Sequence, residues 1–323
     1  MTMLLLSSRT ASEMWQTREE NVDESDAYLL APYRYLIRVP GKKVRTQLIQ
    51  AYNGWLNVES GRLKTICELI ECLHNASLMV DDIEDGSTLR RGLPVTHAIY
   101  GLPRTLNSAN YMYFEALRMC LSLQSNEATR LFSEAMLDLH RGQGKELFWR
   151  DALVCPTEGQ YEKMVEQKTG GVFFLAVRLM RCFSDDSRPL EELNRLFSLF
   201  FQIRDDYQNL TSDEMAEQKS WAEDLTEGKF SYPVLHALTT RKLGRDDELL
   251  SILRKHTADL EMKRYAVRLL EEAGSLRATY ERLQELATRI GEELEKLGGN
   301  EALRGLLDKL VASMKKPSSA AAT

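Results

Sequence analysis

Apolar residues recur every three or four positions along most of the chain, which is the spacing of one face of an α-helix. The run is clearest in residues 63–80, whose apolar positions are Leu63, Ile66, Leu69, Ile70, Leu73, Ala76 and Val80. The same period recurs in residues 128–140, 161–168, 191–210, 246–258, 262–272 and 276–297, and alternating strand patterns are absent. The pattern predicts an all-α fold in which roughly a dozen helices pack as a single large bundle.

The two ends of the chain lack this periodicity. Residues 1–27 are polar and acidic, and residues 315–323 are small and polar. Terminal segments of this kind are poorly ordered unless the fold ties them down. We therefore expect a mobile N-terminal arm over residues 1–27, one helical domain over residues 28–314, and a polar tail over residues 315–323.

Composition and charge narrow the class of protein. The formal net charge of -6 argues against a general affinity for nucleic acid, so any bound anion must be held by a local cluster of lysines and arginines. Apolar runs fall short of the ~18 residues that span a bilayer, so no transmembrane segment is expected. The five cysteines are scattered without a C-x-x-C pair, which predicts neither a zinc site nor a disulfide framework. A reducing, cytoplasmic location fits best.

An acidic stretch, LMVDDIEDGSTLRR, occupies residues 78–91 at the end of an apolar helical run. On a helix over residues 62–85, Asp81 and Asp85 share one face and Asp82 lies beside it. The carboxylates repel one another and oppose the helix dipole at this end. Mg²⁺ would offset that repulsion, because it binds one or two carboxylates together with substrate phosphate oxygens.

A second acidic stretch, FFQIRDDYQN, occupies residues 200–209. Gln202, Asp205, Asp206 and Asn209 fall at helical spacing and form a polar stripe on an otherwise apolar helix. Such a stripe must face a cavity or another polar group, because burying it unpaired is costly. We expect the two acidic stretches to face each other across a central cavity, as metal sites in bundle cores do. A structural ion-pair network is the alternative.

Cationic residues flank these stretches in four places. They are Arg90 and Arg91 after the first stretch, Lys42 and Arg45 in GKKVR, Lys168 beside Thr169 in QKTGG, and Lys219 and Lys229 around the loop QKSWAEDLTEGK. Together they carry enough charge to neutralise two diphosphates. The glycine pair of QKTGG is expected to end a helix. His74 is either a ligand or a core histidine.

These motifs resemble the trans-isoprenyl diphosphate synthase family, most closely its animal and fungal geranylgeranyl diphosphate synthase branch. The matching segments are LMVDDIEDGSTLRRGLPVTHAIYG, FFQIRDDYQN, GKKVR, LHNAS, EQKTGG and DLTEGKFSYP, with Asn209 where many relatives carry a third aspartate. The resemblance implies the isoprenoid synthase fold. It also implies Mg²⁺-dependent condensation of isopentenyl diphosphate with an allylic diphosphate, farnesyl diphosphate being the expected primer, to a twenty-carbon product. A homodimer or an assembly of dimers is expected, and peripheral membrane contact is compatible with a lipidic product.

The resemblance also implies a role for each matching residue. Asp81, Asp85 and Asp205 would hold about three Mg²⁺ ions, with Asp82 and Asp206 nearby in the catalytic group. The allylic diphosphate would be bound by Arg90, Lys168, Thr169, Gln202, Lys219 and Lys229, of which Lys168 and Lys219 also count as catalytic. Isopentenyl diphosphate would be bound by Lys42, Arg45, His74 and Arg91.

Product length is expected to depend on the residues below the first acidic stretch. Ala76 and Ser77 are small where fifteen-carbon synthases carry aromatic residues, so a longer product is expected. Tyr113, Phe114 and His140 are candidates for the floor of the tunnel. A farnesyl diphosphate synthase, a terpene cyclase and a non-catalytic partner subunit are the alternatives.

Overall fold

The computed structural model describes residues 26–41, 43–212, 221–240 and 244–317. These residues are helical apart from loops and one short hairpin. The elements are α2 (Ala27–Ile37), α3 (Val44–Leu56), α4 (Ser60–Glu84), β1 (Leu89–Arg90), β2 (Leu93–Pro94), α5 (Thr96–Tyr100), α6 (Leu102–Ser122), α7 (Asn126–Ala152), α8 (Glu158–Arg181), α9 (Glu191–Thr211), α11 (Glu223–Glu227), α12 (Tyr232–Thr240), α13 (Asp246–Arg254), α14 (Leu260–Glu272), α15 (Ser275–Lys296) and α16 (Glu301–Ala312). The predicted all-α fold is confirmed.

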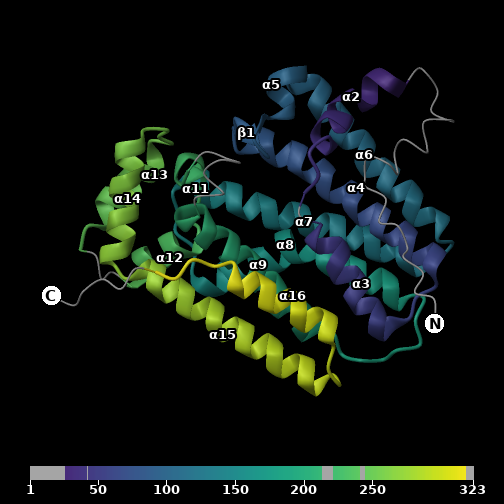
Figure 1. Ribbon diagram of the computed structural model, residues 1–323. Coiled ribbons are helices and arrows are strands. Elements are labelled where there is room, and N and C mark those ends of the chain that lie inside the picture. The colour runs from purple at the N-terminus through teal and green to yellow at the C-terminus, as the bar shows by residue number, and fades with distance from the viewer. Residues whose placement is uncertain (1–25, 42, 213–220, 241–243, 318–323) are drawn as a thin grey trace.

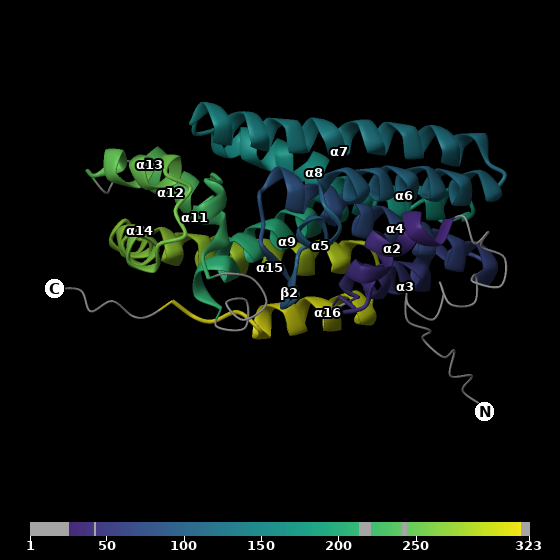
Figure 2. The ribbon, with the colours of Figure 1, turned by 90° about the horizontal axis from the view of Figure 1, so that it is seen from above.

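The long helices lie side by side in successive layers. α7 packs on α8, α8 on α9, and α9 on α15, while α4 packs on α6 and α8. Figures 1 and 2 show α13 and α14 at one end of this bundle, with α2 and α3 at the other. None of the helices in the described part of the chain is long and apolar enough to cross a membrane.

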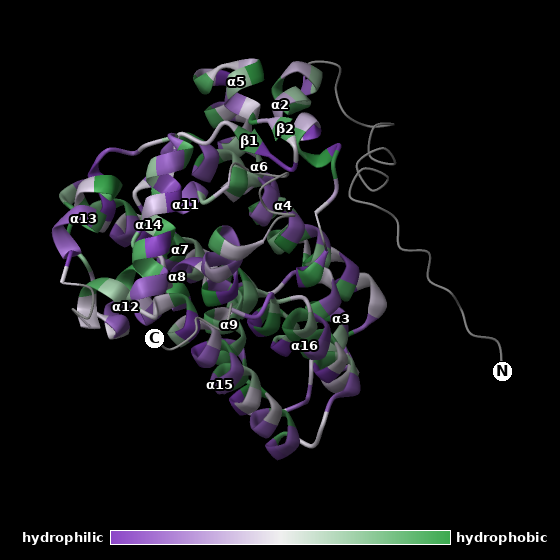
Figure 3. Ribbon diagram, turned by 60° about the vertical axis from the view of Figure 1, so that its left-hand side comes forward, coloured by the Kyte–Doolittle hydropathy of each residue, from purple (hydrophilic) through white to green (hydrophobic). Residues whose placement is uncertain are grey.

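The apolar stripe found in the sequence forms the core. Ile66, Leu69 and Leu73 of α4 are buried, as the helical spacing predicts. α4 begins where the side chain of Glu59 accepts hydrogen bonds from the backbone N–H groups of Gly61 and Arg62, at 2.8 and 3.1 Å. In Figure 3 the outer helices carry hydrophobic residues on one side and hydrophilic residues on the other.

One predicted helix end is wrong. α8 continues through Gly170 and Gly171 to Arg181 instead of ending at the glycines. A Cβ atom on Gly170 would lie 3.0 Å from the Ser198 Oγ on α9, and one on Gly142 of α7 would lie 2.5 Å from the backbone nitrogen of Lys168. Gly142 and Gly170 are therefore needed for the close approach of α7, α8 and α9. This packing stabilises α8 through its glycines despite the low helix propensity of glycine.

Other boundaries differ by less. The helix expected over residues 246–258 ends at Arg254, while α6 begins at Leu102 with a proline in its first turn. The short β1–β2 hairpin was not predicted.

The predicted ends of the domain are only partly covered. Residues 1–25 and 318–323 of the predicted arm and tail lie outside the described residues, as do Lys42 and Lys219. All five cysteines are free.

Candidate functional site

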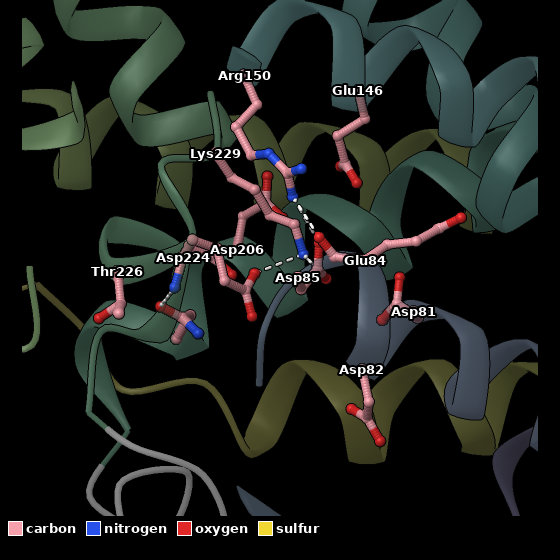
Figure 4. A network of polar contacts seen from close by, with 12 residues as sticks. Asp81, Asp82, Glu84, Asp85, Glu146, Arg150, Asp206, Asp224, Thr226 and Lys229 are labelled. Atoms are coloured by element: carbon pink, nitrogen blue, oxygen red, sulfur yellow. Dashed lines mark hydrogen bonds and ion pairs between the residues drawn. The ribbon is translucent and has the colours of Figure 1, made fainter. Parts of the chain in front are cut away.

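Three aspartates at the end of α4 differ sharply in their surroundings. The side chain of Asp81 is 24% exposed, whereas that of Asp85 is 1% exposed and that of Asp82 is fully buried. Figure 4 shows Lys229 and Arg150 directed at Asp85, with Asp82 apart from them. Lys229 and Arg150 therefore neutralise Asp85, and Asp82 lies apart from these two cations.

Asp85 is held by two cations from distant parts of the chain. Its Oδ2 accepts a hydrogen bond from Lys229 Nζ at 2.6 Å, and its Oδ1 accepts one from Arg150 Nη1 at 3.2 Å. Burial raises the pKa of the Asp85 carboxyl to about 7, against the opposing effect of Lys229. Burial therefore works against ionisation of this carboxylate, and the Lys229 ammonium works in its favour.

Asp81 meets a looser set of partners. Lys168 Nζ lies 3.4 Å from its Oδ1, and Gln143 Nε2 lies 3.5 Å from the same oxygen. Lys168 also forms a close ion pair with Glu146 on α7. Burial by itself would lower the pKa of Lys168, but Glu146 and Asp81 raise it above its usual value, so the lysine stays cationic.

Asp82 pairs with a largely buried arginine, Arg90, whose Nη2 also lies 3.5 Å from Asp81 Oδ2. Arg90 Nε donates to Asp82 Oδ1 at 2.8 Å, and a second nitrogen of Arg90 contacts the same oxygen. Burial opposes the charge of Arg90, yet Asp82 raises its pKa above the ordinary value. Arg90 thus neutralises Asp82 and links the hairpin to α4, and its expected contact with the allylic diphosphate stays a prediction.

The polar stripe on α9 divides into two parts. Asp206 is buried and accepts hydrogen bonds from Tyr161 Oη at 2.6 Å, the backbone N–H of Tyr232 at 2.7 Å and Gln202 Nε2 at 2.9 Å. Burial raises the pKa of Asp206 to about 6, against these hydrogen bonds. Asp205, one position earlier, is exposed and free of that network. Asp206 therefore ties three elements together, while Asp205 is available to a ligand.

Two further contacts connect the stripe to neighbouring elements. Thr169 Oγ1 on α8 donates to Gln202 Oε1 at 2.5 Å. Asn209 Oδ1 accepts from the backbone N–H of Asp224 at 3.3 Å, which fixes the start of the segment that carries Lys229. The predicted stripe thus positions side chains of α8 and the α11 segment as well as its own.

A second cationic group surrounds His74. Arg45 Nη1 donates to His74 Nε2 at 2.8 Å, and its guanidinium lies over the ring of Phe173. Burial lowers the pKa of Arg45 to about 10, with Asp205 acting in the opposite direction. Burial also holds the pKa of His74 well below its usual value, and Arg45 and Arg91 add to this effect. His74 is therefore neutral and orients the guanidinium.

Arg91 completes this group from the hairpin. Its Nη1 donates to the Val39 carbonyl at 2.6 Å, and a Cβ atom on Gly41 would lie 3.0 Å from its other terminal nitrogen. Gly41 therefore leaves room for the guanidinium against the GKKVR segment. Arg45, His74 and Arg91, which the family resemblance assigns to one substrate, therefore lie in one part of the fold.

The residues expected to set product length have different environments. Ala76 is buried, Ser77 is partly buried and donates to the His74 carbonyl at 2.8 Å, and the Tyr113 ring meets the His140 ring edge-on. Phe114 is 70% exposed, so its assignment to the tunnel floor is wrong for this chain. One residue further along α6 turns the side chain by about 100°, from the inner face to the surface. His140 is also exposed.

Several residues of the site were not predicted from the sequence. Gln143, Glu146 and Arg150 lie on one face of α7, at the spacing i, i+3 and i+7. Gln143 and Arg150 contact the acidic end of α4, and Glu146 contacts Lys168 of α8. That spacing was a usable signal. Glu227, which pairs with Lys229 at 2.5 Å, carried no comparable pattern.

The donor atoms fit a hard divalent cation. Asp81, Asp85 and Asp205 offer carboxylate oxygens, which are the ligands that Mg²⁺ prefers together with phosphate oxygens and water. Across the described ranges, no three His, Cys, Asp or Glu side chains are already gathered to hold a metal by themselves.

Comparison with known proteins identifies the family. The polyprenyl synthetase family model matches residues 26–270. A protein named terpene synthase from Matsumurasca onukii is 47% identical over 286 residues, covering 88% of this chain and 94% of its own. A geranylgeranyl pyrophosphate synthase of Aspergillus fumigatus is 44% identical over 304 residues, covering 93% and 85%, and one of Dictyostelium discoideum is 42% identical over 289 residues, covering 90% and 95%. On this evidence, together with the all-helical fold, the chain belongs to the polyprenyl synthetase family.

Proposed function

We propose that this protein is a geranylgeranyl diphosphate synthase, which condenses isopentenyl diphosphate with an allylic diphosphate, farnesyl diphosphate being the expected primer. The observation that carries the proposal is the pairing of two charged groups in one bundle. One joins Asp81 and Asp85 to Lys168 and Lys229, and the other surrounds Arg45. A reaction between two diphosphates needs two such groups.

The first group suits the departure of diphosphate from the allylic substrate. We propose that Asp81, Asp85 and Asp205 hold about three Mg²⁺ ions, which would supply positive charge to the leaving group when bound. Lys168 and Lys229 keep their charge in this site and would donate to the diphosphate oxygens as the C–O bond breaks. Thr169 and Gln202, and the undescribed Lys219, are proposed partners of the same diphosphate.

The second group suits isopentenyl diphosphate. Arg45, oriented by neutral His74, and Arg91 would bind its diphosphate, as would Lys42 from outside the described residues. This binding would align the double bond for attack on the allylic cation. A proton is then lost to the released diphosphate. The stacked Phe173 and Phe201 rings, 5.2 Å apart, suit an apolar surface that keeps water from the cation.

A twenty-carbon product follows from the small residues below the aspartates. Ala76 and Ser77 leave room for a chain that an aromatic side chain would block. Tyr113, whose phenol pKa is raised by burial and by nearby Glu84, is the floor residue that the geometry favours.

We also propose a homodimer, or an assembly of dimers. Helices α6 and α7 expose large apolar side chains, namely Leu102, Leu106, Phe114, Leu121, Leu137 and Phe148. On α6 these residues follow one face, and a second copy of the chain is the occupant that would bury them. Residues 28–314 are the proposed catalytic domain, and a cytoplasmic location is proposed with it.

A terpene synthase is the second candidate, because the relative from Matsumurasca onukii bears that name. An enzyme that only ionises an allylic diphosphate needs no site for isopentenyl diphosphate. The cationic group of Arg45, His74 and Arg91 favours the condensing enzyme.

The test incubates the protein with farnesyl diphosphate, labelled isopentenyl diphosphate and Mg²⁺. We expect label in a twenty-carbon diphosphate and no product after chelation of the metal. Consumption of farnesyl diphosphate to a hydrocarbon without label would establish the terpene synthase instead. No turnover of either kind would indicate a non-catalytic partner subunit, and a fifteen-carbon limit from shorter primers would indicate a farnesyl diphosphate synthase.

A further inference from the structure

Two lysines of the site each contact a pair of carboxylates. Lys168 lies 3.4 Å from Asp81 and forms a close ion pair with Glu146. Lys229 Nζ lies 2.6 Å from Asp85 Oδ2 and 2.5 Å from Glu227 Oε2. In both pairs one carboxylate comes from the acidic end of α4 and the other from a different element, α7 or α11.

We infer that Glu146 and Glu227 are positioning residues that retain the two lysines when the aspartates take up metal. The inference rests on the proposed metal and diphosphate role of the site. Lys168 and Lys229 are held largely away from water, and a buried ammonium needs at least one anionic partner. If each lysine had only its aspartate, the aspartate could not bind a cation without leaving that ammonium unpaired. The second carboxylate removes this conflict.

The segment that carries Lys229 and Glu227 is held firmly enough for this role. The backbone N–H of Lys229 donates to the Asp224 carbonyl at 2.9 Å, and Thr226 Oγ1 donates to the Thr257 carbonyl at 3.0 Å. Gly228 has a φ of 75° and packs so closely on His256 that a Cβ atom would lie 2.6 Å from the ring. The backbone is thus fixed, and the flexible stem of Lys229 allows its ammonium to exchange Asp85 for a diphosphate oxygen.

The carboxylates also differ in what they can offer a metal. Asp81 and Asp85 lie one turn apart on α4, so a cation and a bound diphosphate can use both together. Glu146 and Glu227 come from separate elements and each faces its own lysine. Their arrangement therefore suits retention of the lysines rather than direct ligation of the metal.

The test measures binding of Mn²⁺ by electron paramagnetic resonance, alone and with inorganic pyrophosphate. For the native protein we expect weak binding alone and at least about tenfold tighter binding with pyrophosphate. Glu227→Gln should weaken binding of Mn²⁺ alone by about tenfold, because displacing Lys229 from Asp85 now leaves it unpaired. Pyrophosphate should restore most of this loss, since it supplies the lysine with a new partner. Glu146→Gln should behave in the same way through Lys168.

The controls separate positioning from a structural effect. Glu162→Gln, which removes the carboxylate that pairs with Arg282 at 2.7 Å on the same bundle, should leave both affinities unchanged. Adding Glu227→Gln to Lys229→Met should have no further effect on Mn²⁺ binding, because the glutamate acts through that lysine. Circular dichroism identifies any variant that fails to fold.

Three outcomes would overturn the inference. They are unchanged binding of Mn²⁺ alone in both glutamine variants, a loss that pyrophosphate does not restore, or a full effect of Glu227→Gln in the Lys229→Met background. A native protein that binds no Mn²⁺ even with pyrophosphate would instead overturn the proposed function, and the inference with it.

Discussion

The buried pair of Asp82 and Arg90 yields a quantitative prediction about stability. In Asp82→Asn the shape of the side chain and the Oδ1 acceptor remain, but the carboxylate charge is lost and the enclosed guanidinium of Arg90 keeps only the more distant Asp81 carboxylate, at 3.5 Å, as a contacting anion. Breaking a buried ion pair from one side costs about 3–5 kcal/mol, and the retained acceptor places this variant near 3 kcal/mol. At about 2.1 cal/mol/K per residue for the 323-residue chain, the melting temperature should fall by about 4 °C.

Thermal unfolding of a double-mutant cycle tests this reasoning. Arg90→Gln alone should cost about as much, because it leaves the Asp82 carboxylate buried without its cation. The double variant should cost about 2 kcal/mol less than the sum of the two single variants, because it buries neither charge unpaired. Single effects that add within about 0.5 kcal/mol, or an Asp82→Asn protein as stable as the native one, would refute the assignment of Asp82 to structure.

Three further predictions concern separate parts of the bundle. Ser77→Phe should shorten the product on chromatography, while Phe114→Ala, at an exposed position, should leave product length unchanged; the opposite pattern would reverse the two assignments. Gly142→Ala should lower the free energy of unfolding in denaturant by about 1–3 kcal/mol, because its Cβ would lie 2.5 Å from the Lys168 backbone nitrogen. The same displacement of Lys168 should raise the KM for the allylic diphosphate. An unchanged KM would show that α7 and α8 adjust freely. His74→Gln should reduce the dependence of the free energy of unfolding on pH below about pH 6.5. The pKa of His74 is lowered in the folded state, so between about pH 5 and 6.5 the unfolded chain binds a proton that the native chain does not. The free energy of unfolding of the native protein should therefore rise with pH in this range. Its slope should exceed that of the variant by up to about 1.4 kcal/mol per pH unit. Identical profiles would mean that folding does not shift the pKa of His74.

The sequence predicted the fold class because helical periodicity survives in nearly every long element. α4, α9 and α15 coincide closely with the apolar runs, since each buries a continuous stripe. The two acidic stretches were also recognisable, because a polar stripe beside a buried apolar run demands a partner. Membership of the polyprenyl synthetase family is confirmed by comparison.

The predictions failed where a neighbouring helix decides the outcome. Gly170 was read as a helix end because its local propensity is low, yet close packing against α9 keeps the helix intact. Phe114 was assigned to the interior by motif, although its helix turns it to the surface. Asp82 likewise resembles its two neighbours in sequence, but the fold buries it fully and places Arg90 Nε 2.8 Å from its Oδ1.

The sequence by itself determined that the chain forms helices, that two of these helices carry acidic stretches, and which family those motifs indicate. Such features depend on spacing within one element, which a linear pattern preserves. Tertiary structure alone decided which cation neutralises which carboxylate. Lys229 and Asp85 are 144 positions apart in the chain and 2.6 Å apart in the fold. Their pairing depends on how α4, α9 and the α11 segment pack, and no local pattern encodes that geometry.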